Sequence, residues 1–451
     1  MGNVPVLNIA DPALIKTLLV KDFHLFPNRT KLRPSSNAIT TQNLNQLSGD
    51  DWKRVRSIVS PTFSSGKMRK MYPRFRECLT DFMRHLDGIA RTGQTIDLWK
   101  AFDDFAIDVI ATTVFATKID TYKSRDNRFV VNARQKFSFN LIQAMAGIML
   151  PKFLSQWLKV TDPKSNEFFI DTVRHIIGQR KEMGTGQKYN DFVQLLMDAK
   201  LRDIKDRKMM QDDVDDHVDE GDEESEIRRK VLDINYARKQ LTENEVIAQA
   251  FVFLLAGYFT TFSALAYFTY ELALNPLIQQ KLYDEINGAI DSDGEIPYDV
   301  LTRLPYLEAV FAESLRLHSG ALPLARLATT DYKLGDTGIT IKAGQQIEIP
   351  IYAMHLSEHY FPDPYKFDPG RFMPENKHKI KPYTYLPFGA GPRNCIGMRF
   401  ALIEIKICMA HLIRRYRFYR CPQTDVPIEY KRFIHVMLPK RLVVGFEKRI
   451  Q

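Results

Sequence analysis

The sequence contains few cysteines. Its 451 residues include four, Cys78, Cys395, Cys408 and Cys421, and no two of them form a C-x-x-C pair. A small scaffold held together by disulfides needs more cysteines than this, so that class of protein is excluded. The thiols therefore indicate a reducing compartment, in which at most one or two of them carry a function.

A strong excess of one charge is also absent. The chain has 63 lysines and arginines against 54 acidic residues, a net charge of +9, and no tight basic block with interleaved aromatic residues. We therefore predict no nucleic-acid partner. The mild positive charge is compatible with an anionic membrane surface or an acidic protein as partner. Residues 1–16 lack a basic segment followed by a long apolar core, which excludes a signal peptide.

Long apolar runs are limited to one. No charged residue occurs between Val246 and Tyr270, a length that could cross a bilayer. Polar side chains interrupt the run, however, and its flanking charges, at Glu245 and Glu271, are acidic on both sides. A membrane span usually has basic residues on one flank. We predict a buried central helix here, with a membrane span as the alternative.

Helical spacing of apolar residues dominates the rest of the chain. It predicts helices over 67–91, 101–115 and 246–274, followed by a further helix from Pro276 to 289. Short β-like runs separated by glycines predict strands at 339–341 and 346–351. These patterns predict a mainly α protein with a small β region.

No linker divides the sequence, so we predict a single domain over 1–451. Residues 203–230 are dense in acidic side chains and have almost no apolar periodicity. Such a segment cannot bury enough apolar surface to become ordered. We predict a flexible acidic loop over these residues.

The most informative segment is PFGAGPRNCIG, residues 387–397, which precedes an amphipathic helix pattern over 398–413. A thiolate at the start of a helix, here Cys395, is stabilised by the helix dipole and by free amide N–H groups. The glycines allow the backbone to approach a flat group, and Arg393 adds a cation. This combination suits a metal-bound thiolate beside a planar anionic cofactor. A buried structural cysteine is the alternative, and the absence of G-K-[S/T] excludes a Walker loop.

The pattern F-G-x-G-x-R-x-C-x-G at 388–397 resembles the haem-binding signature of the cytochrome P450 family. Other motifs of that family occur in the same order as in its members, from about residue 5 to 449. They are W-x-x-x-R at Trp52 and Arg56, A-G-Y-F-T-T at 256–261, E-x-x-R at Glu313 and Arg316, and F-D-P-G-R-F at 367–372. The chain is similar to the microsomal, 3A-like drug-metabolising enzymes and their invertebrate relatives. The resemblance implies the cytochrome P450 fold, which is mainly α with a small β region.

The resemblance also implies a cofactor and the residues that hold it. The cofactor would be haem b, with Cys395 as the axial metal ligand. The other cofactor-binding residues would be Phe388, Gly389, Arg393, Gly397, Trp52, Arg56 and Arg326. Oxygen activation would involve Thr260 and Thr261, and a structural charge network would join Glu313, Arg316 and Arg371. Substrate contacts would come from Phe253, Ala256, Ala321, Leu322, the 32–48 loop and the 433–438 turn.

The activity that the resemblance implies is that of a haem-thiolate monooxygenase. It would oxidise a lipophilic small molecule with O2 and with electrons from NADPH, delivered by NADPH–cytochrome P450 reductase. Cytochrome b5 is a further candidate electron donor, and the location would be the cytoplasmic face of the endoplasmic reticulum membrane. The N-terminal membrane anchor of microsomal relatives is expected to be missing from this chain.

Two departures from the family pattern affect the expected chemistry. Phe259 stands at a catalytic position where an acid usually helps to deliver protons, and Gly370 replaces a glutamate. A phenylalanine cannot carry a proton. An isomerase or dehydratase that acts on peroxides without a reductase, or a weakly active haem protein, therefore remains as an alternative. If Phe259 only packs behind the helix, protons would follow another route.

A second metal motif competes with this interpretation. Residues 355–359 read H-L-S-E-H, which matches the inverted zinc-protease motif H-x-x-E-H. A zinc site of this type needs both histidines on one face of a rigid helix. Pro350 and Pro362 bracket a segment too short for such a helix. The haem site is therefore the prediction, and zinc is the alternative.

Overall fold

The computed structural model describes residues 5–30, 37–119, 121–123, 126–137, 163–183, 189, 191–199, 222–232, 240–292, 294–320, 323–431 and 438–449. The α-helices are α1 (Pro12–Lys16), α2 (Gly49–Val59), α3 (Ser65–Ala90), α4 (Leu98–Phe115), α5 (Arg128–Phe137), α8 (Pro163–Met183), α9 (Phe192–Met197), α11 (Asp222–Leu232), α12 (Glu243–Leu274), α13 (Pro276–Gly288), α14 (Tyr298–Leu301), α15 (Pro305–Leu317), α16 (Ile351–His355), α17 (Pro374–Lys377) and α18 (Met398–Arg415). Short helical turns are η1 (Thr17–Lys21), η2 (Phe23–Leu25), η3 (Thr40–Gln42), η4 (Ser60–Phe63) and η6 (Pro369–Phe372). The strands are β1 (Val6–Asn8), β2 (Ile96–Asp97), β3 (Leu324–Leu327), β4 (Tyr332–Lys333), β5 (Thr340–Ile341), β6 (Gln346–Ile349), β7 (Tyr416–Tyr419), β8 (Tyr430–Lys431), β9 (Leu438–Pro439) and β10 (Val443–Lys448).

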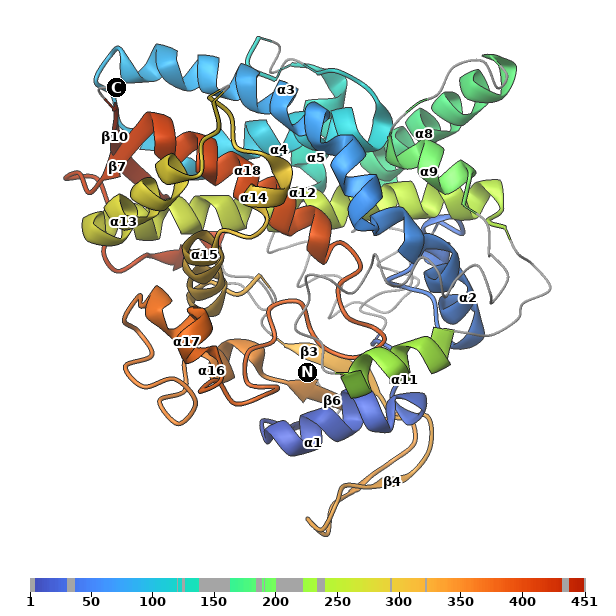
Figure 1. Cartoon of the computed structure of the whole chain (residues 1–451). Helices are drawn as coiled ribbons and strands as arrows, with labels where there is room; N and C mark the ends of the chain where they lie inside the picture. The colour runs from blue at the N-terminus through green and yellow to red at the C-terminus, as the bar shows by residue number, and fades with distance from the viewer. Residues whose placement is uncertain are drawn as a thin grey trace.

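Helix α12 runs through the middle of the molecule (Figure 1). It begins at a capping box, in which the side chains of Thr242 and Glu245 each accept a hydrogen bond from the other residue's backbone N–H. It contacts α4, α8, α15 and α18. Its length and composition would also suit a membrane span, but 61% of its most apolar window is buried in the protein. The prediction of a buried central helix is confirmed.

The β structure is small and lies at the edges of the helical body. β6 pairs with β1 in parallel and with β3 in antiparallel orientation, which places Arg326 opposite Ile347. A second sheet has the order β2-β10-β7, and two further pairs are β4–β5 and β8–β9. The predicted strand at 346–351 ends at Ile349. Pro350 has no N–H for the ladder, and Ile351 instead begins α16.

Two large apolar clusters form the core, and the cysteine loop lies between them. The first joins α2, α3, α4, α12, α15 and α18, and the second joins β1, α1, η1, β6 and α16. Leu386 and Ala390 are buried in the second cluster, whereas Phe388 and Ile396 pack against the first. The loop that carries Cys395 is therefore held by side chains that alternate between two cores.

The acidic segment differs from its prediction. Residues 200–221 lie outside the described residues, but Asp222–Leu232 form α11, so a loop is wrong for 222–230. The helix is ordered by contacts with other elements. Ile227 packs against the second apolar cluster, and the carboxylate of Glu223 pairs with Lys16, 2.5 Å away. Tertiary contacts have overridden a local composition that is unfavourable for order.

Candidate active site

The loop between Leu386 and α18 is fixed by its own backbone. The N–H of Cys395 donates to the carbonyl of Phe388 at 2.9 Å, which closes the loop on itself. Gly389 and Gly391 have φ values of 72° and 73°, in the left-handed region that glycine adopts most readily. A Cβ on Gly391 would lie 2.0 Å from the carbonyl oxygen of Leu19. The sequence therefore needs glycine there, because η1 touches the loop backbone.

Cys395 is the uncovered residue of this loop. Arg393 and Asn394 are buried immediately before it, whereas the Cys395 side chain is exposed. Burial nevertheless raises the pKa of its thiol, and this is opposed by the Gly397 N–H and by the charges of Arg56 and Arg29. The Cys395 side chain therefore lies close enough to Arg56 and Arg29 for their charges to act on it. A thiolate at this point needs a further cationic partner, such as a metal ion.

Four arginines gather around the same loop. The guanidinium of Arg56 donates to the carbonyl and side-chain oxygens of Asn394, at 3.0 and 2.8 Å. Arg393 donates to backbone carbonyls and lies 4.8 Å from the centre of the Trp52 ring, which supports it from one side. Arg29 donates to the carbonyl of Arg393 at 3.1 Å. Arg326, on β3, is 1% exposed and donates to the carbonyl of Ala325 at 2.9 Å.

Burial disfavours the charge on three of these arginines. Burial lowers the pKa of Arg29 and lowers that of Arg326 further, with Arg29 and Arg393 adding repulsion to Arg326. Burial, with Arg29 and Arg56 adding repulsion, lowers the pKa of Arg393 to about 9. The Nε atoms of Arg29, Arg326 and Arg393 are buried without a hydrogen-bond partner among the residues described above. Such a cluster favours an anion with several oxygen atoms, because buried charges need partners.

Helix α12 contributes an uncovered face. Ala256 and Thr260 are exposed, while Tyr258 and Thr261 are buried. A spacing of four places Ala256 and Thr260 on one side of a helix. The Thr260 hydroxyl donates to the carbonyl of Ala256 at 2.5 Å, so its oxygen remains able to accept a hydrogen bond. The Thr261 hydroxyl, in contrast, is buried and has no partner within the described part of the chain.

Phe259 points toward an aromatic cluster. Its ring is half-buried and meets Trp99 at 6.1 Å and Phe262 at 5.3 Å, both edge to face. Contacts of this geometry stabilise by about 0.5–1.5 kcal/mol each. The ring therefore has a packing role, and position 259 still provides no acid.

The three residues of the expected charge network are brought together. Glu313 and Arg316, both 0% exposed, form a two-point ion pair at 2.7 and 2.8 Å. Arg371 lies 3.5 Å from the same carboxylate, and the Asp368 N–H donates to it at 2.9 Å. Burial raises the pKa of Glu313, against the opposing effect of Arg316. Arg316 also donates to the carbonyl of His355 at 2.8 Å and so ties α15 to α16.

Comparison with known proteins gives one consistent result. The family model described as Cytochrome P450 matches residues 1–221 and 207–446. The chain belongs to the cytochrome P450 family. It is 34% identical to "Cytochrome P450 3A7" of Homo sapiens over 99% of this chain and 83% of that protein. It is 34% identical to "Cytochrome P450 9e2" of Blattella germanica, over 99% and 84%. It is also 32% identical to "Cytochrome P450 3A9" of Rattus norvegicus, over 95% and 80%.

Membership of the family confirms three predictions. The mainly α cytochrome P450 fold is the fold of this chain, the family is the predicted one, and the chain is an enzyme of the P450 monooxygenase class. The family implies a haem cofactor. The residues present fit it: an exposed thiol lies beside a cluster of buried guanidinium groups, and the Nε atoms of Arg29, Arg326 and Arg393 have no hydrogen-bond partner in the described part of the chain. A haem carries two propionate groups and an iron that binds a thiolate.

The structure adds residues that the sequence analysis did not include. Arg29 belongs to the guanidinium cluster, although its local sequence, Asn28-Arg29-Thr30, resembles only a glycosylation sequon. Asn394 orients Arg56 through its side-chain oxygen. The Leu327 N–H, at the end of β3, donates to the carbonyl of Asn28 at 2.9 Å and so brings the segment of Arg29 next to Arg326. Only knowledge of this pairing could have identified Arg29 from the sequence.

Part of the expected substrate site cannot be placed. Ala321, Leu322 and residues 31–36 and 432–437 lie outside the described residues. Phe253 is half-buried and packs edge to face against Phe63 and Phe192, at 5.2 and 4.6 Å. One part of its ring therefore packs against Phe63 and Phe192, and the rest remains accessible.

The zinc alternative is not supported by the geometry. Helix α16 ends at His355, so His359 is not on the same helix. The Nε2 atom of His355 accepts a hydrogen bond from the Leu386 N–H at 2.9 Å, and burial lowers the pKa of His355 to about 3. This neutral histidine supports the start of the cysteine loop and is not available as a ligand.

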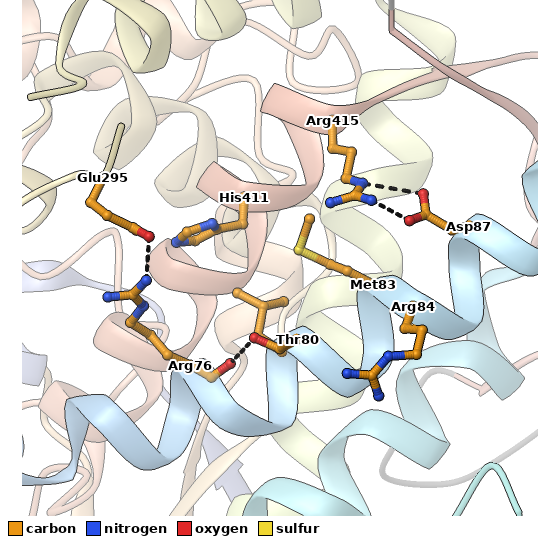
Figure 2. A pocket seen from close by; sticks show the side chains of 9 residues that line it. Arg76, Thr80, Met83, Arg84, Asp87, Glu295, His411 and Arg415 are labelled. Atoms are coloured by element: carbon orange, nitrogen blue, oxygen red, sulfur yellow. Dashed lines mark hydrogen bonds and ion pairs between the residues drawn. The ribbon is translucent and has the colours of Figure 1, made fainter. Parts of the chain in front are cut away.

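A separate polar pocket of about 370 Å³ lies between α3 and the C-terminal half of α18 (Figure 2). Ion pairs close two of its sides: Arg76 with Glu295, and Arg415 with Asp87. His411, on α18, lies between them (Figure 2). It is 14 residues beyond Gly397, which corresponds to roughly 20 Å along a helix. This pocket is distinct from the cysteine loop, and its pairs stabilise the packing of α3 on α18.

Helix α18 also carries a buried carboxyl group. Glu404 is 1% exposed, and neither of its oxygens has a hydrogen-bond partner among the described residues. Burial raises the pKa of Glu404 well above its ordinary value, so the folded protein binds this proton more tightly than the unfolded chain does. Its contribution to stability is complete below the unfolded pKa of ~4.3 and decreases as the pH rises toward the folded value.

Replacement of Glu404 by methionine is therefore expected to stabilise the protein. Removal of an unsatisfied buried polar group should raise the free energy of unfolding by about 1–3 kcal/mol. The gain should grow with pH, by at most ~1.4 kcal/mol per unit. Thermal unfolding at three pH values from about 6 to 8.5 measures this. Glu375→Met, at an exposed position on α17, is the control and should show no such slope. A gain that shrinks with rising pH would contradict the assignment of a protonated Glu404.

Proposed function

We propose that the chain is a haem-thiolate monooxygenase that oxidises a lipophilic small molecule with O2 and electrons from NADPH. The observation that carries this proposal is the cluster of four arginines around the exposed Cys395, in which the buried Nε atoms of Arg29, Arg326 and Arg393 have no hydrogen-bond partner among the described residues. Bound haem would supply the iron at which O2 is activated. Cys395 would be its axial ligand, and electron donation from a thiolate favours O–O cleavage.

The chain's own residues would orient the cofactor. Arg29, Arg56, Arg326 and Arg393 would bind the two propionates, since a guanidinium pairs with a carboxylate at two points. Trp52 would hold Arg393 in place through the face of its ring. Phe388, Gly389 and Gly397 would shape the loop so that its backbone lies close to a flat group.

Thr260, on the exposed face of α12, would take part in proton delivery. Its own proton is donated to the Ala256 carbonyl, so its oxygen would accept a hydrogen bond from the reacting group. Thr261 lies one position further along the helix, with a buried hydroxyl that could bind a water molecule. A water chain through these two threonines would replace the acid that position 259 lacks.

The substrate would be apolar. Ala256 is an exposed apolar side chain on the Thr260 face of α12, and Phe253 lies on the same helix. Electrons would come from NADPH–cytochrome P450 reductase, with cytochrome b5 as a further donor, and the net charge of +9 favours an acidic protein partner. The enzyme would act at the cytoplasmic face of the endoplasmic reticulum membrane.

The proposal is tested with the wild-type protein, reductase, NADPH and a panel of lipophilic compounds. We expect a thiolate-type absorption band for the reduced CO complex and a product that contains one oxygen atom from ¹⁸O-labelled O2. Phe259 favours a second candidate, an isomerase or dehydratase that acts on peroxides. That function would give product from a peroxide without reductase and without label from O2, and it would overturn the monooxygenase proposal.

Replacement of Phe259 by glutamate is expected to have two separable effects. General acid–base help is worth about 10²–10⁴-fold in rate, so a restored acid should raise the ratio of product to NADPH consumed. Loss of the contacts with Trp99 and Phe262 should also lower stability by about 1–2 kcal/mol. Product yield, NADPH consumption and thermal unfolding measure both effects.

Phe259→Leu is the matched control, because it removes the aromatic contacts without adding an acid. It should lose the same stability as Phe259→Glu and gain no coupling. If the wild type is already tightly coupled and Phe259→Glu lowers turnover, position 259 has no part in proton delivery.

A further inference from the structure

Helix α11 reaches the cysteine loop from the acidic segment of the chain. Glu224, in its first turn, is buried, and its carboxylate accepts a hydrogen bond from the Gly391 N–H at 2.5 Å. Gly391 is separated from Cys395 by 3 residues in the same loop. In Figure 1, α11 lies beside α1 at the edge of the molecule. A residue 167 positions away in the sequence therefore contacts the loop backbone directly.

The second oxygen of Glu224 binds the segment that leads into this loop. It accepts a hydrogen bond from the Tyr383 hydroxyl at 3.1 Å. Tyr383 and Gly391 have φ values of 65° and 73°. A non-glycine residue in this region costs about 1–3 kcal/mol and persists only where its surroundings fix it. One carboxylate thus joins two left-handed positions, Tyr383 before the loop and Gly391 within it.

Gly391 is held from the other side as well. The carbonyl of Leu19, in η1, lies so close that a Cβ on Gly391 would be 2.0 Å from its oxygen. The loop backbone at this point is therefore enclosed between η1 and α11. Helix α11 itself is anchored on η1 and α1 by Ile227 in the apolar cluster and by the ion pairs of Glu223 with Lys16 and Lys21.

We propose that Glu224 is a positioning residue for the iron ligand: through Gly391 and Tyr383, it fixes the conformation of the loop that presents Cys395. The acidic segment thereby becomes part of the active-site support. This proposal rests on the proposed function only in taking Cys395 as the haem ligand. Glu224 touches neither the cofactor nor the substrate and acts through the loop backbone.

The test compares three variants of the haem-loaded protein. Glu224→Ala removes both acceptors, Glu224→Gln keeps an oxygen for the Gly391 N–H, and Glu223→Ala removes only the exposed ion pairs of the same helix. Hydrogen exchange in the peptide 386–397 measures the loop, in both the haem-loaded and the haem-free protein. The fraction of the reduced CO complex with the thiolate-type band measures the iron ligand.

In Glu224→Ala, loop exchange should accelerate roughly tenfold or more, the factor for a lost hydrogen bond to a charged group. In the same variant, the fraction of the reduced CO complex that shows the thiolate-type band should fall during mild heating. Glu224→Gln should restore most of both values, and Glu223→Ala should match the wild type.

The proposal is overturned if Glu224→Ala keeps wild-type loop exchange, or if Glu223→Ala reproduces its defect. Should Glu224→Ala not fold, Tyr383→Phe removes only the hydroxyl that donates to Glu224; a loosened loop in that variant supports the proposal, and wild-type exchange opposes it. A wild type without a thiolate-type band would instead refute the haem-ligand assignment, while exchange in the haem-free protein would still test Glu224.

Discussion

Replacement of Cys395 by alanine is expected to abolish the thiolate-type band of the reduced CO complex and all NADPH-dependent product formation. The reason is that no other side chain of the loop can donate electrons to iron as a thiolate does. The guanidinium cluster is unchanged in this variant, so haem should still bind, more weakly. Absorption spectra with and without CO, together with a haem-to-protein ratio, measure the ligand and the binding separately.

The control is Cys421→Ala. Cys421 is buried, and its thiol contacts the Thr424 hydroxyl at 3.3 Å, away from the loop. This variant should retain the wild-type band and activity, with a small loss of stability. A wild-type CO band in Cys395→Ala would mean that the ligand has been assigned to the wrong residue. Loss of the band in both variants would indicate a general folding defect.

The cysteine loop could be predicted from sequence because its determinants are local. The Cys395 N–H closes the loop on the carbonyl of Phe388, seven positions earlier, and Cys395 stands just before the helix that follows it. The helices were predictable for the same reason: the apolar spacing that defines α12 is contained within the helix, as is its capping box. Where the physical cause lies within about ten residues, the pattern and the structure agree.

The parts that sequence reasoning missed depend on distant partners. Arg29 contacts Arg393 across 364 positions, and Glu224 contacts Gly391 across 167. Neither residue has a neighbouring sequence that distinguishes it from an ordinary surface charge. The acidic composition around Glu224 predicted a flexible loop, and this prediction is wrong for 222–230. The helix at Asp222–Leu232 exists because lysines and an apolar cluster are supplied by the N-terminal segment.

Replacement of Glu313 by alanine is expected to have the largest effect on folding. Arg316 would then be left fully buried without its carboxylate, and the Asp368 N–H would lose its acceptor. Removal of one partner of a buried ion pair costs about 3–5 kcal/mol. Native proteins are stable by only ~5–15 kcal/mol, so this change consumes much of the total. We therefore expect Glu313→Ala to yield aggregated or haem-free protein. Cys395→Ala, in contrast, should yield a folded protein.

A matched control lies on the same helix. Glu308 is also in α15, but its side chain is 50% exposed, and its ion pair with Lys406 measures 3.3 Å. Lys406 is buried, but it also donates to the carbonyl of Thr302 at 2.7 Å and keeps this acceptor when Glu308 is removed, so Glu308→Ala should yield soluble, haem-loaded protein. Glu313→Gln keeps an acceptor for the Asp368 N–H and removes the charge, so its yield should fall between the two. Soluble yield, haem content and thermal unfolding rank the three variants. If Glu313→Ala is as stable and as fully haem-loaded as Glu308→Ala, the buried pair does not hold α15 to the segment around Asp368, and the fold depends on the apolar contacts of α15 instead.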